Sequence, residues 1–120
     1  MKPKIDKTSF GYITIEGETY EHDIIIRLNG EIKKRKKKLS KKYYDTSHII
    51  SFEEAEHIYE DGADKLIIGS GQTGMVKLSD EARELFNKKD CQVVISPTSK
   101  AAEIWNEEKG SVIAMLQITC

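Results

Sequence analysis

The chain has 120 residues, of which 38% are hydrophobic and 32% are charged, and its formal net charge is −1. These values exclude a disordered chain and fit a single domain, residues 1–120, that is large enough to bury a core. The absence of any eighteen-residue apolar run or apolar N-terminal signal core predicts a cytoplasmic protein with no membrane-spanning segment.

The N-terminal third predicts β-structure. Residues 10–15 (FGYITI) alternate in a way that predicts a strand, and residues 23–28 (DIIIRL) predict another. Asn29-Gly30 favours a type I′ turn, because both residues tolerate the left-handed conformation that this turn requires. The return strand, which starts at Glu31, is expected to continue as an extended hairpin leg into a basic segment.

This basic segment, residues 33–42, has eight basic residues and no acid, so the rest of the chain has 11 basic against 20 acidic residues, a net charge of −9. Such a segment can bind RNA, and Tyr43 and Tyr44 are close enough in the sequence to stack on its bases. It can also bind an acidic protein surface, including the surface of a second copy of this chain. It is equally the pattern of a solvated hairpin leg. The eight residues of the predicted basic patch are Lys33, Lys34, Arg35, Lys36, Lys37, Lys38, Lys41 and Lys42.

Helices and strands alternate through the remainder of the chain. Ser51 and Glu54 have the spacing of a capping box, which predicts a helix that ends near Gly62, and Ser79 caps a second helix. A third helix is expected to begin at Thr98, with Trp105 on its buried stripe. Strands are predicted at residues 65–68, 91–96 and 112–118. The order of elements predicts a three-layer α/β domain with a mixed central sheet, about three helices and an N-terminal hairpin.

A glycine-rich loop, Gly69-x-Gly71-x-x-Gly74, follows the strand at 65–68. Backbone N–H groups in such a loop can bind a small anion, so the candidate ligand-binding residues are Gly69, Ser70, Gly71, Gln72, Thr73 and Gly74. The alternative is a tight turn that needs glycine for positive φ angles. No acid ends the next predicted strand and no Lys-Ser/Thr pair follows Gly74, so no nucleotide cofactor is expected. No pair of histidines has metal-ligand spacing, so no metal is expected.

His48 is the candidate catalytic residue. A neutral imidazole at this position can act as a general base if Asp45 or Tyr44 orients it. The alternative is a loop histidine that hydrogen-bonds the backbone. Cys91 opens a predicted buried strand and is expected to be an inert packing residue.

Three motifs together resemble a known family. These motifs are Ser47-His48 before the first helix, residues 66–74 (LIIGSGQTG), and the terminal Thr119-Cys120. The chain resembles, from about residue 10 onward, the small domain-of-unknown-function family that includes adipogenesis-associated domain proteins and mitochondrial complex I assembly factor three. The resemblance implies a three-layer sandwich with a pocket where the glycine loop meets the His48 segment and the last strand. Ser47, Gln117 and Cys120 would form its rim, and Gln117 stands where some relatives carry a histidine.

These observations favour a protein-interaction or assembly-type protein with a small-anion pocket at the glycine loop, because the chain lacks a complete catalytic set. Its expected ligands are a protein partner and a small anion. Two alternatives remain open, a small enzyme that uses His48 as general base and an RNA-binding protein that uses residues 33–42. The family has no settled enzyme activity, so the resemblance bears mainly on the fold.

Overall fold

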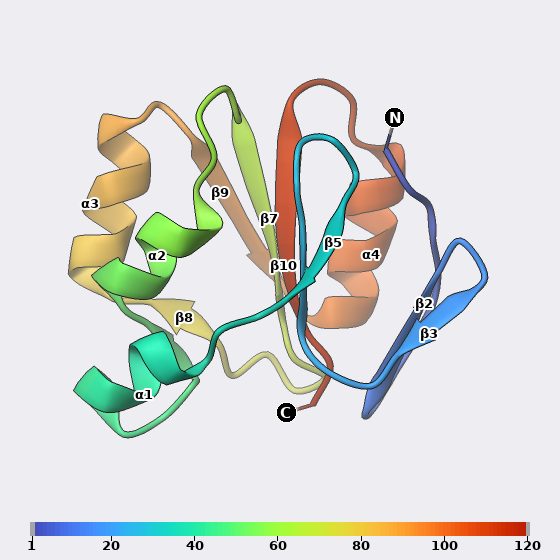
Figure 1. The fold of residues 1–120 in the computed structure, drawn as a ribbon, viewed down its shortest axis with the longest axis horizontal. Coiled ribbons are helices and arrows are strands. Elements are labelled where there is room, and N and C mark those ends of the chain that lie inside the picture. The colour runs from blue at the N-terminus through green and yellow to red at the C-terminus, as the bar shows by residue number, and fades with distance from the viewer. Residues whose placement is uncertain (1, 120) are drawn as a thin grey trace.

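The structure of the chain is a computed structural model that describes residues 2–119. A mixed five-stranded sheet forms the centre of its fold (Figure 1). Its strands are β4 (Ile24–Ile26), β5 (Ile32–Lys34), β7 (Lys65–Ser70), β9 (Gln92–Ser96) and β10 (Val112–Gln117). The strand order is β5-β4-β10-β7-β9; β10, β7 and β9 are parallel, while β4 and β5 add to β10 as an antiparallel pair. The predicted α/β class and mixed sheet are confirmed.

Helices and a smaller sheet cover the two faces of this central sheet. The helices are α1 (Lys38–Tyr44), α2 (Phe52–Ile58), α3 (Asp80–Lys88) and α4 (Thr98–Glu107). The remaining strands are β1 (Ile5–Ser9), β2 (Tyr12–Ile15), β3 (Glu18–Tyr20), β6 (Ile49–Ile50) and β8 (Lys77–Leu78). In Figure 1, α2 and α3 lie on one side of the sheet with α1 below them, and α4 lies on the other side with β1, β2 and β3. None of the helices in residues 2–119 is long and apolar enough to span a lipid bilayer.

Alternating side chains of the central strands fill two separate hydrophobic cores. In β7, Leu66 and Ile68 pack with Ala55 and Phe86 beneath α2 and α3. Their neighbour Ile67 points the opposite way and packs with Trp105 and the buried residues of β1 and β2. Both faces of β7 are therefore covered, as expected for a strand in the parallel part of a three-layer fold.

The N-terminal region differs from the predicted single hairpin. Residues 5–20 form a three-stranded antiparallel sheet, β1-β2-β3, and β1 was not predicted because its sequence, IDKTS, has little apolar content. The turn between β4 and β5 is not type I′. Gly30 has a φ of 89°, but Asn29 does not have a positive φ, and the amide of Gly30 donates to the carbonyl of Arg27 at 2.9 Å. This is the longer hairpin connection in which a glycine follows a tight turn.

The basic segment is not an extended leg throughout. Its first residues complete β5, but Lys38–Tyr44 is helix α1, which brings the number of helices to four. The helix ends at Asp45 in the left-handed conformation, with φ 57°, and Lys41 and Lys42 lie in its last turn, where positive charge is favourable.

The two serine-capped helices begin where the sequence predicts. The Ser51 hydroxyl accepts a hydrogen bond from the Glu54 amide, and the Ser79 hydroxyl accepts one from the Ala82 amide. Helix α2 is shorter than expected, because it ends at Ile58, and Phe52 in its first turn is 43% exposed. The buried residue of its first turn is Glu54, whose carboxylate binds Arg35.

Candidate functional site

The glycine loop after β7 is closed by its own hydrogen bonds. The amide of Gly71 donates to the Thr98 hydroxyl at 2.9 Å, and the amide of Gln72 donates to the Thr119 carbonyl at 2.7 Å. The amide of Gly74 donates to the Gly71 carbonyl at 3.3 Å. The expectation of unpaired main-chain donors is therefore wrong for these three amides, which connect the loop to α4 and to the end of β10.

Glycine at 69 serves close packing. A Cβ atom at this position would lie 2.7 Å from a methyl carbon of Leu116 and 3.0 Å from the hydroxyl oxygen of Thr98. By contrast, Gly71 and Gly74 have φ angles of 98° and 72°, so they meet a conformational requirement of the turn. The alternative interpretation of the motif, a tight turn that needs glycine, accounts for these observations.

Replacing Gly69 with alanine should destabilise the fold by about 1–3 kcal/mol, because the added methyl group forces Leu116 or the start of α4 to move. Urea denaturation measures this change. Gly110 is a control, because it has open space around its Cβ position. Because Gly110 has a φ of 98°, Gly110→Ala should lower the free energy of unfolding only through local backbone strain, by about 1 kcal/mol. Equal stability of wild type and Gly69→Ala would contradict the packing role.

His48 lies next to β8, the short strand that follows the glycine loop. Its carbonyl accepts a hydrogen bond from the Lys77 amide at 2.8 Å, and its own amide donates to the Thr46 hydroxyl at 3.1 Å. This pairing places His48 directly before β6. His48 does not line the cleft over Arg35 described below, and its role as a general base stays a prediction.

The centre of the candidate site is Arg35, which the sequence placed in an exposed basic patch but which is only 3% exposed. Its Nε donates to Glu54 Oε2 at 2.6 Å, and its Nη1 donates to Asp23 Oδ2 at 3.0 Å and to Gln117 Oε1 at 2.8 Å. Its Nη2 donates to the Ser47 carbonyl at 2.7 Å and to Glu54 Oε1 at 3.3 Å. The planar guanidinium thus joins strand β10, the residue before β4, helix α2 and the loop before β6.

Glu54 contributes its carboxylate to this network instead of completing the capping box. The Ser40 hydroxyl of α1 donates to Glu54 Oε1, and the same hydroxyl accepts from the Ser51 amide at 2.9 Å. Ser40 therefore takes the position that a capping glutamate would otherwise fill. As a result, α1 and α2 are joined through the side chain that binds Arg35.

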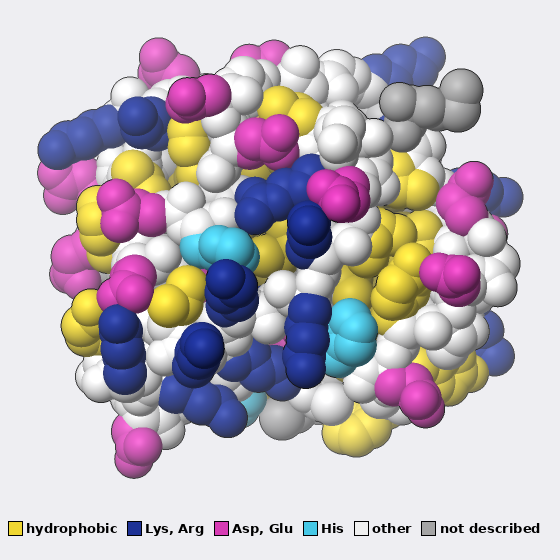
Figure 2. Space-filling view, viewed as in Figure 1, with side chains coloured by type: hydrophobic (Ala, Val, Ile, Leu, Met, Phe, Trp, Pro, Cys, Tyr) yellow, Lys and Arg dark blue, Asp and Glu magenta, His cyan; other side chains and the backbone are white. Residues whose placement is uncertain are grey.

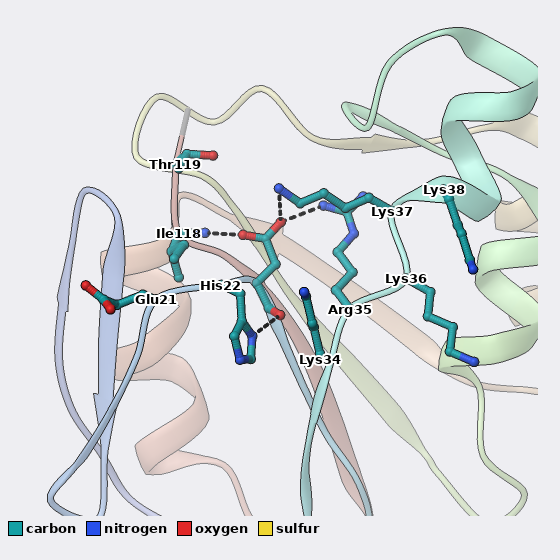
Figure 3. Close-up of a pocket in the computed structure, with 10 residues that line it drawn as sticks. Glu21, His22, Lys34, Arg35, Lys36, Lys37, Lys38, Ile118 and Thr119 are labelled. Carbon is teal, nitrogen blue, oxygen red and sulfur yellow. Dashed lines mark hydrogen bonds and ion pairs between the residues drawn. The ribbon is translucent and has the colours of Figure 1, made fainter.

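Asp23 connects the buried network to the surface. Its Oδ1 accepts from the Ile118 amide at 2.9 Å, while its Oδ2 also receives Lys37 Nζ at 3.3 Å (Figure 3). The Asp23 carboxylate is almost fully buried, whereas the Lys37 side chain is 37% exposed. Arg35 faces two carboxylates, so Lys37 supplies the positive charge that balances the group.

A cleft of about 580 Å³ opens directly over Asp23 and Arg35. Its wall comes from β5, the segment before α1, the residues before β4, and the end of β10 (Figure 3). We name it the lysine cleft; its lining consists of Glu21, His22, Asp23, Lys34, Arg35, Lys36, Lys37, Lys38, Ile118 and Thr119. Figure 2 shows Lys and Arg side chains gathered over the same part of the molecule.

The predicted basic patch is only partly present as free positive charge. Arg35 is buried, Lys37 pairs with Asp23, Lys33 pairs with Glu31 at 3.4 Å, and Lys42 pairs with Glu53 at 2.8 Å. The pKa of Lys42 is raised above its usual value, chiefly by its hydrogen bond to Glu53. The exposed lysines of the cleft are Lys34, Lys36 and Lys38, and Lys41 lies further along α1.

The predicted rim residues separate in the structure. Ser47 and Gln117 both contact Arg35 beneath the lysine cleft. Gln117 also lies beside the glycine loop, because it pairs with Ser70 across β10 and β7. Cys120 lies outside the described residues. Cys91 is 3% exposed, and burial, with a smaller contribution from Asp64, raises the pKa of its thiol to about 11, as suits a packing residue. Within residues 2–119, no group of three potential metal ligands comes together.

Comparison with known proteins identifies the family. The model of the family described as "Protein of unknown function (DUF498/DUF598)" matches residues 5–117. The chain belongs to this family. No curated protein sequence matches the chain.

Several solved structures share the fold. The crystal structure of conserved hypothetical protein PH1505 from Pyrococcus horikoshii is 35% identical, with a TM-score of 0.92, over 98% of this chain and 99% of that one. The structure of MT938 is 30% identical, with a TM-score of 0.82, over 99% of this chain and all of the other. A Mth938-like domain protein from Bordetella pertussis is 15% identical with a TM-score of 0.65, over 97% of this chain and 85% of that one, and shows the fold alone.

Sequence reasoning did not single out Asp23 or the buried role of Arg35 and Glu54. Two signals point to them in retrospect. Glu54 shares the helical spacing of Ala55 and Ile58, so it falls on the buried stripe of α2. Arg35 is the single arginine among seven lysines in residues 33–42, and arginine suits a buried, multiply bonded position better than lysine does.

Proposed function

We propose that this DUF498 protein is a cytoplasmic protein-interaction domain whose lysine cleft binds an acidic segment of a partner protein. The observation that carries the proposal is the concentration of the exposed Lys34, Lys36 and Lys38 around one cleft. The rest of the chain is acidic, so this cleft is where a negatively charged partner finds complementary charge. The small anion expected from the sequence is, in this proposal, a carboxylate of that partner.

The buried network beneath the cleft supports this function. Arg35 and Asp23 hold the start of β4, β5 and the end of β10 together through hydrogen bonds of 2.8–3.0 Å. A cleft with a fixed floor loses less conformational entropy when a ligand binds. Lysines at its rim remain free to adjust to carboxylates, since their charges lie on flexible side chains.

Two alternatives have less support from the geometry. RNA binding was expected from eight clustered positive charges, but Arg35 is buried and Lys33, Lys37 and Lys42 are paired with carboxylates, which leaves fewer charges for phosphates. An enzyme that uses His48 would need its partners in one cavity with it, yet His48 does not line the lysine cleft.

A triple charge reversal tests the proposal. Lys34→Glu, Lys36→Glu and Lys38→Glu together should weaken binding of a glutamate-rich peptide by about thirtyfold or more, because three attractive charges become repulsive. Fluorescence anisotropy of a labelled peptide at physiological salt measures the affinity. The matched control reverses Lys7, Lys100 and Lys109, which are exposed and lie outside the cleft, so that both variants have the same net charge.

Two results would overturn the proposal. The first is equal loss of binding in both triple variants, which would show that only net charge matters. The second is a strong preference of the wild type for single-stranded RNA over the acidic peptide, which would make the RNA-binding alternative correct.

A further inference from the structure

The exposed large hydrophobic side chains are not scattered over the described part of the chain. Four are prominent: Phe10, Tyr43, Phe52 and Met75, which are between 43% and 65% exposed. Tyr43 and Phe52 line a cleft of about 410 Å³ between α1 and α2. Phe10 and Met75 belong to two loops that are hydrogen-bonded to Ile118 and Thr119, which follow β10 and line the lysine cleft.

Phe10 lies in the turn between β1 and β2, which is held against the end of the last strand. The amide of Gly11, the next residue, donates to the carbonyl of Ile118 at 2.7 Å, and Ile118 lines the lysine cleft. Phe10 is nevertheless 65% exposed, the highest value among the four. An aromatic ring is therefore presented to solvent next to the cleft.

Met75 belongs to the glycine loop, which reaches the same edge from the other side of β10. The amide of Gln72 donates to the carbonyl of Thr119 at 2.7 Å, and Thr119 also lines the lysine cleft. Met75 is 51% exposed. In Figure 1, the β1–β2 turn and the loop after β7 both lie at the lower edge, near the carboxyl end of β10.

We infer that the lysine cleft and the exposed side chains of Phe10 and Met75 form one surface that binds an acidic protein segment with apolar residues flanking its carboxylates. This inference rests on the proposed function and specifies the partner. Charged groups at the cleft orient the segment, while an aromatic ring and a flexible thioether supply apolar contact area beside it. The glycine loop then contributes a side chain, Met75, and not its main-chain amides.

Two labelled peptides test the inference. Both carry the same run of glutamates; one has leucines at both ends of the run, and the other has serines there. The wild-type protein should bind the leucine peptide about tenfold more tightly, and Phe10→Ser and Met75→Ser should each remove most of this preference while leaving the serine peptide unaffected. Phe52→Ser is the matched control, because it removes an exposed ring that lines the separate cleft between α1 and α2.

The outcomes separate this inference from the proposed function. If both peptides bind equally well and depend on the cleft lysines, the apolar part is overturned and the proposed function stands. If neither peptide binds, both are overturned. Binding to anionic lipid vesicles that depends on Phe10, with no peptide binding, would instead make the surface a membrane contact and overturn both. Circular dichroism of Phe10→Ser and Met75→Ser checks that a loss of the preference does not reflect unfolding.

Discussion

Replacing Arg35 with methionine should lower the free energy of unfolding by about 3–5 kcal/mol. Methionine fills a similar elongated space without charge, so the main effect is on the charges that Arg35 now compensates. Asp23 and Glu54 would remain in the interior with only Lys37 nearby, since both carboxylates are almost fully shielded from solvent. Leaving buried charge without its partner is among the largest penalties that a single substitution can introduce.

Urea denaturation followed by circular dichroism measures this effect, and Lys36→Met provides a control at the neighbouring exposed position. Adding Asp23→Asn and Glu54→Gln to Arg35→Met should recover part of the lost stability, because no uncompensated charge remains. A loss below about 1 kcal/mol for Arg35→Met alone would show that the network contributes little.

The stability of this network bears on the proposed function, because Arg35 and Asp23 form the floor of the lysine cleft. Their bonds fix the position of the segment that carries Lys36 and Lys37 relative to the end of β10. A substitution that weakens the floor should therefore also weaken binding, even though Arg35 itself has no free donor in the network described above. Charge reversal at Lys36 should affect binding without affecting stability, which separates the two roles.

Sequence patterns predicted the parts of the fold that depend on local signals. Helices begin after Ser51 and Ser79, as the two serines predict. Strands β7 and β10 lie where the hydrophobic runs predict them. Strand β1 and helix α1 were missed, because neither has an apolar pattern of its own. Residues of α1 are mostly polar, and the helix is held in place by Ser40 hydrogen bonds to α2, which no local pattern reports.

The candidate site was predicted less well, for a related reason. Asp23, Arg35, Glu54 and Gln117 are far apart in the sequence and meet only when β4, β5, α2 and β10 assemble. In the sequence, Arg35 cannot be distinguished from its lysine neighbours by charge. Only its burial shows that it compensates internal carboxylates while the lysines around it remain at the surface.

Replacing Thr98 with valine should destabilise the fold by about 2–4 kcal/mol, because each buried group that loses its hydrogen-bond partner costs about 1–3 kcal/mol. The side chain of Thr98 is fully buried, and its hydroxyl accepts from the Gly71 amide at 2.9 Å and donates to the Gln117 carbonyl at 2.5 Å. Valine has nearly the same shape but no hydroxyl, so one buried donor and one buried acceptor lose their partner.

Thr98→Ser is the matched control, because it keeps the hydroxyl and removes only a methyl group, with an expected cost of about 1 kcal/mol. Urea denaturation gives the free energies, and hydrogen exchange of the Gly71 amide should become faster in the valine variant alone. Similar stability of the valine and serine variants would contradict a structural role for the hydroxyl.

The same variant distinguishes a structural glycine loop from an anion-binding one. If the loop amides bound an anion, removing the Thr98 hydroxyl would free the Gly71 amide and strengthen binding of phosphate or sulfate. In the structure, however, the neighbouring amides of Gln72 and Gly74 remain bonded to Thr119 and Gly71, so one freed amide lacks the additional donors that an anion site requires. We therefore expect no gain in anion affinity from Thr98→Val, only a weaker connection between the loop, α4 and the last strand.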